Sequence, residues 1–122
     1  MATIGYFEGT DPLVLTRLVL SGIETLPVSN GYDNHGRYVM HLTRHDNIAA
    51  VVGYLHKVMP AAGVPLGPRD FITACRTQGI PLVLIVPRED HETACELLGD
   101  VAEWVALVDP SDVFNQLLAL AR

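Results

Sequence analysis

The side chains best suited to proton transfer lie in a short glycine-flanked segment, residues 30–36. Asp33 and His35 belong to this segment, and a histidine exchanges its proton near neutral pH. Glu8, which follows the first strand-like run, could face His35 as a carboxylate partner. An acid–base enzyme of lyase or isomerase type, using His35 with Glu8 or Asp33, is therefore one prediction. We favour its alternative, a turn in which Asp33 and Asn34 bond their own backbone, because such turns form without any chemistry.

Polar residues near the expected strand ends predict a binding site for a small anionic molecule. Helix N-termini on the same side aim backbone N–H groups at the site, which suits a negatively charged group. Arg88 could in addition clamp a carboxylate or phosphate, although Arg88 and His91 also fit an ordinary charged first turn of a helix. The residues predicted to bind the ligand are Gly9, Thr10, Asn30, Tyr32, Asn34, Arg88 and His91.

Three histidines that are close in sequence, His35, His41 and His45, raise the question of a metal site. Six residues of strand span about 20 Å, so His35 and His41 would lie at opposite ends of the strand that joins them. His41 and His45 with Asp46 fall short of the ligands that a closed site needs. We therefore predict neither a metal ion nor a cofactor.

Several common chemistries lack their sequence motifs. The chain has no GxGxxG after its first strand, no GxxxxGK[ST] and no GxSxG, which disfavours dinucleotide enzymes, P-loop NTPases and ordinary α/β hydrolases. The single lysine, Lys57, is predicted in a helix beside His56 and is a poor Schiff-base residue. Cys75 and Cys95 lack CxxC spacing, so we predict two reduced cysteines buried in helices.

The apolar run at residues 80–87 sets the fold prediction. It carries no polar side chain, is too short to span a bilayer, and is rich in β-branched residues, so it predicts a strand buried on both faces. Such a strand requires helices above and below a largely parallel sheet. We therefore predict one α/β domain over residues 1–122, a three-layer Rossmann-like sandwich.

The other elements follow from turn and capping signals. Strands are predicted at 3–8, 25–29, 37–42 and within 101–108, and helices at about 12–21, 47–59, 68–78, 88–98 and 109–121. The short turn at 30–36 predicts a hairpin, so strand 37–42 should be an antiparallel edge of a mostly parallel five-stranded sheet. Two helices before strand 80–87 agree with the hairpin, because an even number of passes returns the chain to the starting edge.

This fold predicts where the site lies. Ligands of open α/β sheets bind outside the carboxyl ends of the parallel strands, near a switch in strand order. The segments expected to meet at that edge are 8–11, 30–36, 60–68, 87–91 and 108–112.

Composition limits the partners. The formal net charge is −6 and no basic run is present, which disfavours nucleic acids and anionic membranes. The hydrophobic share of 49% and a segment at 12–21 that is apolar nearly all round predict a homo-oligomer that forms through helix 12–21 or helix 47–59. Without an export signal, we expect a cytoplasmic protein. The leading prediction is a ligand-binding or regulatory module, with a structural assembly protein as a further alternative.

Overall fold

The computed structural model describes residues 2–30, 36–38, 41–59 and 68–122. In these residues six strands form one sheet in the order β3-β2-β1-β4-β5-β6, and every neighbouring pair is parallel. The strands are β1 (Thr3–Tyr6), β2 (Glu24–Ser29), β3 (Arg37–Tyr38), β4 (Ile48–Tyr54), β5 (Leu82–Ile85) and β6 (Val105–Val108). The α-helices are α1 (Pro12–Leu20), α2 (Pro68–Thr77), α3 (His91–Leu98) and α4 (Val113–Ala121).

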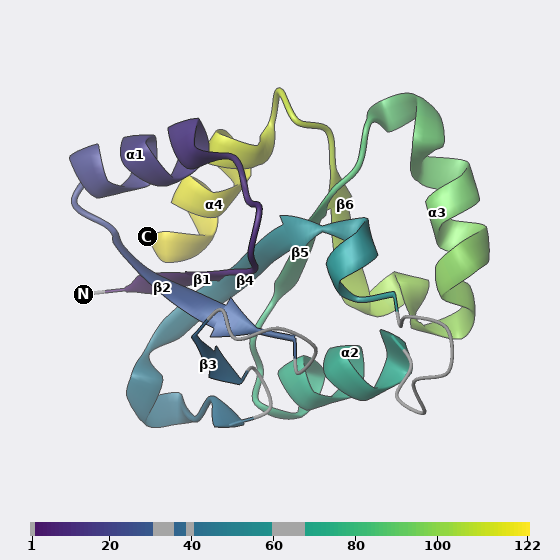
Figure 1. Ribbon diagram of the computed structural model, residues 1–122, viewed down its shortest axis with the longest axis horizontal. Helices are drawn as coiled ribbons and strands as arrows, with labels where there is room; N and C mark the ends of the chain where they lie inside the picture. Colours follow the sequence, from purple (N-terminus) through teal and green to yellow (C-terminus); the bar gives the residue numbers. More distant parts are fainter. Residues whose placement is uncertain (1, 31–35, 39–40, 60–67) are drawn as a thin grey trace.

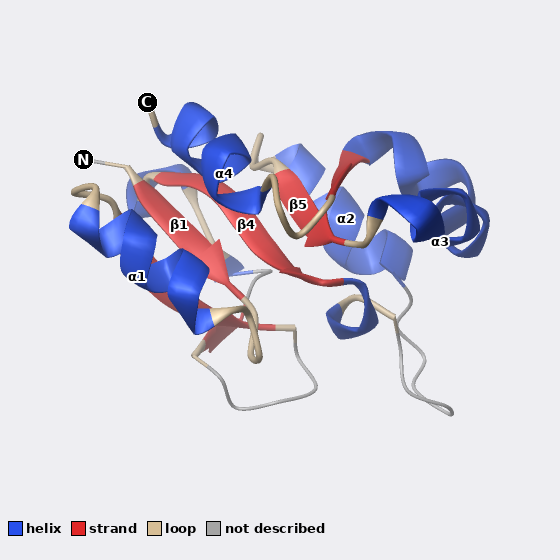
Figure 2. Ribbon diagram, turned by 90° about the horizontal axis from the view of Figure 1, so that it is seen from above, coloured by secondary structure: helices blue, strands red, loops and turns tan. Residues whose placement is uncertain are grey.

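Helices cover both faces of the sheet (Figures 1 and 2). Helices α1 and α4 contribute Leu18 and Leu117 to the core on one face, whereas α2 and α3 contribute Ile72 and Leu98 to the core on the other. Side chains of β5 alternate between these two cores, and all four are buried. The predicted three-layer Rossmann-like sandwich and the doubly buried strand within residues 80–87 are thus confirmed.

The helix predicted at 47–59 is wrong, because most of that segment is the central strand β4. Its apolar residues at 48, 51, 52, 55 and 58 mimic helical spacing. Between residues 48 and 55 the run carries no charged side chain, and a strand buried on both faces shows no alternation that would reveal it. Ala50 and Val52 enter one core while Val51 enters the other, so tertiary burial of both faces decides the conformation.

The prediction of an antiparallel edge strand is also wrong. Strand β3 runs parallel to β2, with Val28 opposite Arg37 and Ser29 opposite Tyr38, and in the described residues it is only two residues long. The even number of helices before strand 80–87 supported the hairpin only if residues 47–59 formed one of those helices, and they contain β4 instead. Gly36, before β3, has a φ of 129°, and a side chain there would collide with the carbonyl group of Pro27.

Helix α1 begins and ends as the sequence predicts. Asp11 caps it by accepting a hydrogen bond of 2.9 Å from the N–H of Leu13, and Pro12 occupies the first turn. Gly22, just past its end, has a φ of 82°, a backbone conformation that favours glycine. Within the described part of the chain, no helix has both the length and the apolar content needed to cross a membrane.

Candidate functional site

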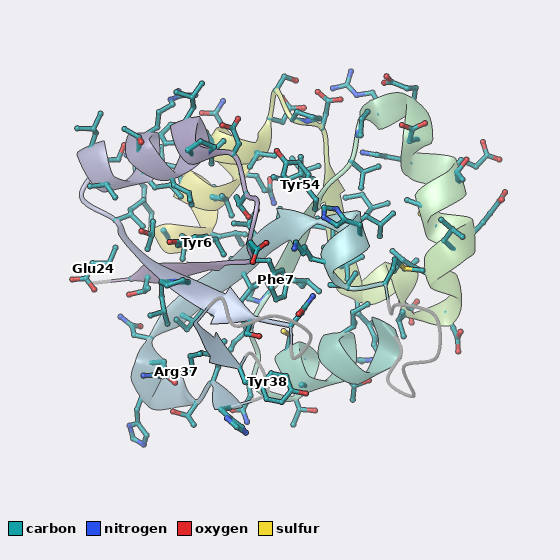
Figure 3. All side chains as sticks on the ribbon, viewed as in Figure 1. Tyr6, Phe7, Glu24, Arg37, Tyr38 and Tyr54 are labelled. Atoms are coloured by element: carbon teal, nitrogen blue, oxygen red, sulfur yellow. The ribbon has the colours of Figure 1, made fainter. Side chains whose placement is uncertain are left out.

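Strand order reverses between β1 and β4, and ligands of open α/β sheets bind outside the strand ends at such a reversal. Here the reversal is filled. Phe7 follows β1 directly, is only 1% exposed, and packs on Gly53 of β4. A Cβ atom on Gly53 would lie 2.6 Å from the Phe7 ring. The glycine therefore admits the ring, and the ring occupies the crevice; Figure 3 labels Phe7 among the strand ends.

Polar side chains join the ends of three strands beside Phe7. The Nζ atom of Lys57 lies 3.7 Å from Oε1 of Glu8, and the side-chain amide of Asn30 donates a 2.7 Å hydrogen bond to the Lys57 carbonyl oxygen. Glu8 and Asn30 are thus at the predicted edge of the sheet. Sequence reasoning missed Lys57, because it was placed within a helix rather than in the 3₁₀ turn η3 (Leu55–Lys57) that follows β4.

The loop between β1 and α1 is held by its own hydrogen bonds. The buried Thr10 hydroxyl donates a 2.7 Å hydrogen bond to the Phe7 carbonyl oxygen, and Gly9 has a φ of 86°. Asp11 already places a carboxylate at the start of α1. The described contacts of Gly9 and Thr10 are those of loop residues, and their role in ligand binding stays a prediction.

The predicted acid–base pair cannot be placed. Tyr32, Asp33, Asn34 and His35 lie outside the described residues, so the pairing of His35 with Glu8 or Asp33 stays a prediction.

The structure describes contacts of His41 and Asp46, two of the residues that were considered as metal ligands. The ring of His41 meets Tyr38 edge-on at 5.1 Å. Asp46 pairs with Arg37, and hydrogen bonds from the backbone of Thr43 and from Arg37 hold the pKa of Asp46 below its usual value. Among the described residues, no group of three or more His, Cys, Asp or Glu side chains could hold a metal ion.

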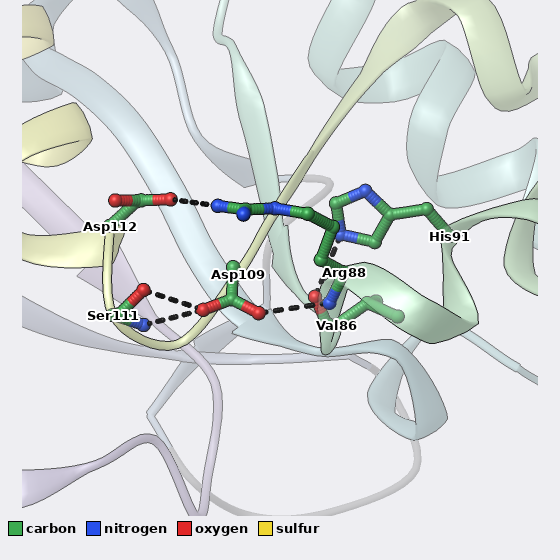
Figure 4. Close-up of polar contacts among 6 residues, drawn as sticks. All are labelled: Val86, Arg88, His91, Asp109, Ser111 and Asp112. Carbon is green, nitrogen blue, oxygen red and sulfur yellow. Dashed lines mark hydrogen bonds and ion pairs between the residues drawn. The ribbon is translucent and has the colours of Figure 1, made fainter.

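Arg88 and His91 contact other protein groups at the ends of β5 and β6 (Figure 4). The Arg88 backbone N–H donates a 2.9 Å hydrogen bond to Asp109, and its guanidinium lies 3.2 Å from a carboxylate oxygen of Asp112. The Nε2–H of His91 donates to the Val86 carbonyl oxygen at 2.8 Å, since that oxygen can only accept. These contacts are those of the charged first turn of a helix, and the binding of an anion by Arg88 and His91 stays a prediction.

Asp109 is the centre of this loop contact. Its carboxylate accepts hydrogen bonds from the Ser111 hydroxyl at 2.6 Å and from the Ser111 backbone N–H at 3.1 Å, in addition to the one from Arg88. These bonds, the Ser111 hydroxyl first, lower the pKa of Asp109 to about 2. The loops after β5 and β6 are therefore joined through an ionised carboxylate.

The two cysteines lie in different environments. Cys75 is buried in α2, and burial raises the pKa of its thiol to about 11, which makes it a packing residue as expected. Cys95 in α3 is exposed, so its predicted burial is wrong. It directly follows Ala94, which with Leu98 is one of the two buried residues of this helix.

A cleft of about 310 Å³ opens at the carboxyl edge between η3, the end of β5, and α3. In Figure 1 this region lies where β4 and β5 end beside α3. Its walls are mainly apolar, and three polar side chains, His56, Asp90 and Thr93, complete them. The lining residues are Leu55, His56, Ile85, Val86, Pro87, Asp90, Thr93, Ala94 and Leu97.

Asp90 and His56 are the acidic and the basic side chain among the described residues that line this cleft. Asp90 is the residue before α3, yet its carboxylate accepts no capping hydrogen bond from the first turn of that helix. The His56 ring stacks on Tyr54, with ring centroids 6.2 Å apart and planes 18° from parallel. The arrangement can bind an apolar group along the walls and a polar group at Asp90 and His56.

Sequence reasoning found only part of this cleft. The segment 87–91 was expected at the site, but Thr93, Ala94 and Leu97 were not. With Asp90 these residues have the spacing i, i+3, i+4 and i+7 and so form one face of α3. The signal was available in that spacing.

No protein-family model matches the chain, and a search of curated proteins finds no match.

Proposed function

We propose that this chain is a small-molecule-binding or regulatory module whose ligand occupies the cleft between η3, the end of β5 and α3. The observation that carries the proposal is the position of this cleft. It opens at the carboxyl ends of parallel strands, which is where open α/β sheets bind their ligands. Its volume of about 310 Å³ lies within the range of small-ligand pockets, and its mixture of apolar walls with few polar groups is typical of them.

The acid–base enzyme stays the alternative. It needs His35 and Asp33 beside Glu8, and in the described residues Glu8 lies near the Lys57 ammonium group. A cytoplasmic location also belongs to the proposal, and the free thiols of Cys75 and Cys95 fit a reducing compartment.

A blocked cleft tests the proposal. Thr93 is exposed and lines the cleft, whereas Glu96 is exposed on the same helix and does not. Thr93→Tyr should place a ring in the cleft, and Glu96→Tyr is the matched control. We would screen small aromatic amines, alcohols and carboxylates by ligand-detected NMR. Compounds that bind the wild type should lose about tenfold or more in affinity in Thr93→Tyr and keep it in Glu96→Tyr. Equal affinities in both variants, or a panel without a binder, would overturn the proposal.

Self-association through α1 is a second candidate function. Leu13 and Leu20 on this helix are 72% and 81% exposed, which is costly for apolar side chains unless another surface covers them. The other predicted contact helix, 47–59, cannot serve, because those residues contain the central strand β4.

Sedimentation analysis tests this second candidate. The wild type should sediment as a dimer or larger species, and the double variant Leu13→Glu/Leu20→Glu as a monomer. Leu97→Glu, which charges an exposed leucine on α3 instead, should leave the assembly unchanged. A monomeric wild type at high protein concentration would rule the candidate out.

A further inference from the structure

We infer that the cleft beside α3 takes an apolar ligand with a cationic nitrogen, such as an arylalkylamine, whose ammonium group pairs with Asp90. The inference rests on the proposed function, and it names the class of ligand for that same cleft. It differs from the anionic ligand that the sequence suggests.

The first argument is the state of Asp90. Asp90 is one of the residues that line the cleft. Its carboxylate does not cap α3, and among the described residues this carboxylate takes part in no hydrogen bond or ion pair. A carboxylate is a pure acceptor with two oxygens. It is therefore a ready partner for an N–H donor, and charge-assisted hydrogen bonds of this kind are among the strongest in proteins.

The second argument is the charge around Asp90. Glu89 and Glu92 are exposed and lie within two residues of it, so three acids gather at this end of α3. Arg88, the nearest arginine in sequence, directs its guanidinium to Asp112. The negative potential of such a group attracts cations and repels a ligand carboxylate.

The third argument concerns the α3 N-terminus, which by itself would favour an anion. Asp90 directly precedes the helix and supplies negative charge at that end without a capping hydrogen bond. Among the described lining residues, His56 is the basic one, and the Nζ atom of its neighbour Lys57 lies near Glu8. A ligand carboxylate in the cleft would thus meet one imidazole and the Asp90 carboxylate, with Glu89 and Glu92 nearby in sequence.

The fourth argument is the shape of the apolar part. Leu55 and Val86, directly after β4 and β5, line the cleft together with Ala94 and Leu97 of α3. Leu55, Val86 and Ala94 pack in the core on the same face of the sheet. Aliphatic walls of this kind bury a flat ring or an alkyl chain, while Asp90 at the start of α3 meets the polar end of the ligand.

Three probes with the same ring and similar chains separate the ligand classes: 2-phenylethylamine, 2-phenylethanol and 3-phenylpropanoate. Their affinities would be measured by NMR titration of the wild type, Asp90→Asn, Glu89→Gln and Thr93→Tyr at neutral pH. Glu89→Gln is the matched control, because it removes the same charge one residue away and does not line the cleft.

We expect the amine to bind the wild type about tenfold or more tightly than the propanoate. Asp90→Asn should weaken amine binding by about fivefold, in line with the loss of one ion pair at an exposed site. Glu89→Gln should change it less than threefold. Binding of the alcohol should be insensitive to Asp90→Asn and sensitive to Thr93→Tyr.

The failures of the two proposals are distinguishable. If the alcohol or the propanoate binds as tightly as the amine, or if Asp90→Asn and Glu89→Gln weaken the amine equally, the ligand class is wrong. The cleft would still be the binding site as long as Thr93→Tyr weakens binding. If the three probes bind and Thr93→Tyr leaves all of them unaffected, the cleft itself is wrong. If none of the three binds, the amine class is rejected.

Discussion

Strand β4 borders two positions at the carboxyl edge of the sheet that differ in their side chains. On its β1 side, the reversal in strand order is filled by Phe7, which is 1% exposed and packs on Gly53. On its β5 side, the cleft beside α3 stays open and ends at a leucine, Leu97, that is 58% exposed. The comparison teaches that strand topology determines at which edge of the sheet crevices can form, whereas the volume of the side chains determines which of these crevices stays open.

The filled position explains why the chain lacks a dinucleotide motif without losing the strand order that such proteins use. A glycine-rich loop lets a ligand approach the backbone after the first strand. Here the residue at that point is Phe7, and the glycine that makes room is Gly53 on the neighbouring strand. A protein side chain therefore fills this space, and no ligand can occupy it.

The largest effect is expected for Phe7→Ala. Removing a fully buried ring from the filled crevice should lower the free energy of unfolding by about 3–5 kcal/mol. Urea unfolding followed by circular dichroism measures it, and Phe7→Leu, which keeps most of the volume, should cost less. A cost of under ~1 kcal/mol for Phe7→Ala would mean that the ring does not seal the crevice.

The next effect is expected for Gly53→Ala. The added methyl group would meet the Phe7 ring at 2.6 Å, and overpacking of this kind costs about 1–3 kcal/mol. Urea unfolding of both single variants and of the double variant Phe7→Ala/Gly53→Ala gives their coupling. The cost of Gly53→Ala should shrink when the ring is absent. If Gly53→Ala costs the same free energy of unfolding with and without the Phe7 ring, the cost does not come from contact with that ring.

A smaller effect is expected at the open position. Leu97→Ala should change the free energy of unfolding by only about 0.5 kcal/mol, because the side chain is largely exposed already. The same urea experiment applies, and Leu98→Ala, a buried neighbour on the same helix, is the control that should cost clearly more. A Leu97→Ala cost similar to that of Leu98→Ala would contradict the open cleft.

The last prediction concerns the loop contact next to the cleft. Because the pKa of Asp109 in the folded chain is about 2, against an ordinary value of 3.8, the unfolded chain binds a proton there at higher pH than the folded chain does. The contribution of Asp109 to stability is therefore present above about pH 4 and is lost as the pH falls toward 2. In Asp109→Asn, unfolding measured across this window should depend less on pH. An unchanged slope would mean that the hydrogen bonds from Ser111 and Arg88 do not stabilise the carboxylate.

Local sequence signals predicted the elements whose conformation depends on near neighbours. The apolar run at 80–87 contains β5, and Asp11 with Pro12 begins α1 as expected. The site edge was predicted as well, and Glu8 and Asn30 lie there. The cleft itself was not predicted, because it needs residues of α3 to face η3 across the ends of β4 and β5.

By itself, the sequence determined the α/β class, the doubly buried strand, the start of α1 and the edge at which the strands end. Caps, turns and continuous apolar runs act over a few residues, so they can be read along the chain. The tertiary structure alone decided that residues 48–54 form the central strand, that β3 is parallel to β2, and that Phe7 fills one crevice while another stays open. These outcomes depend on burial and on contacts between residues far apart in the chain, such as Phe7 with Gly53.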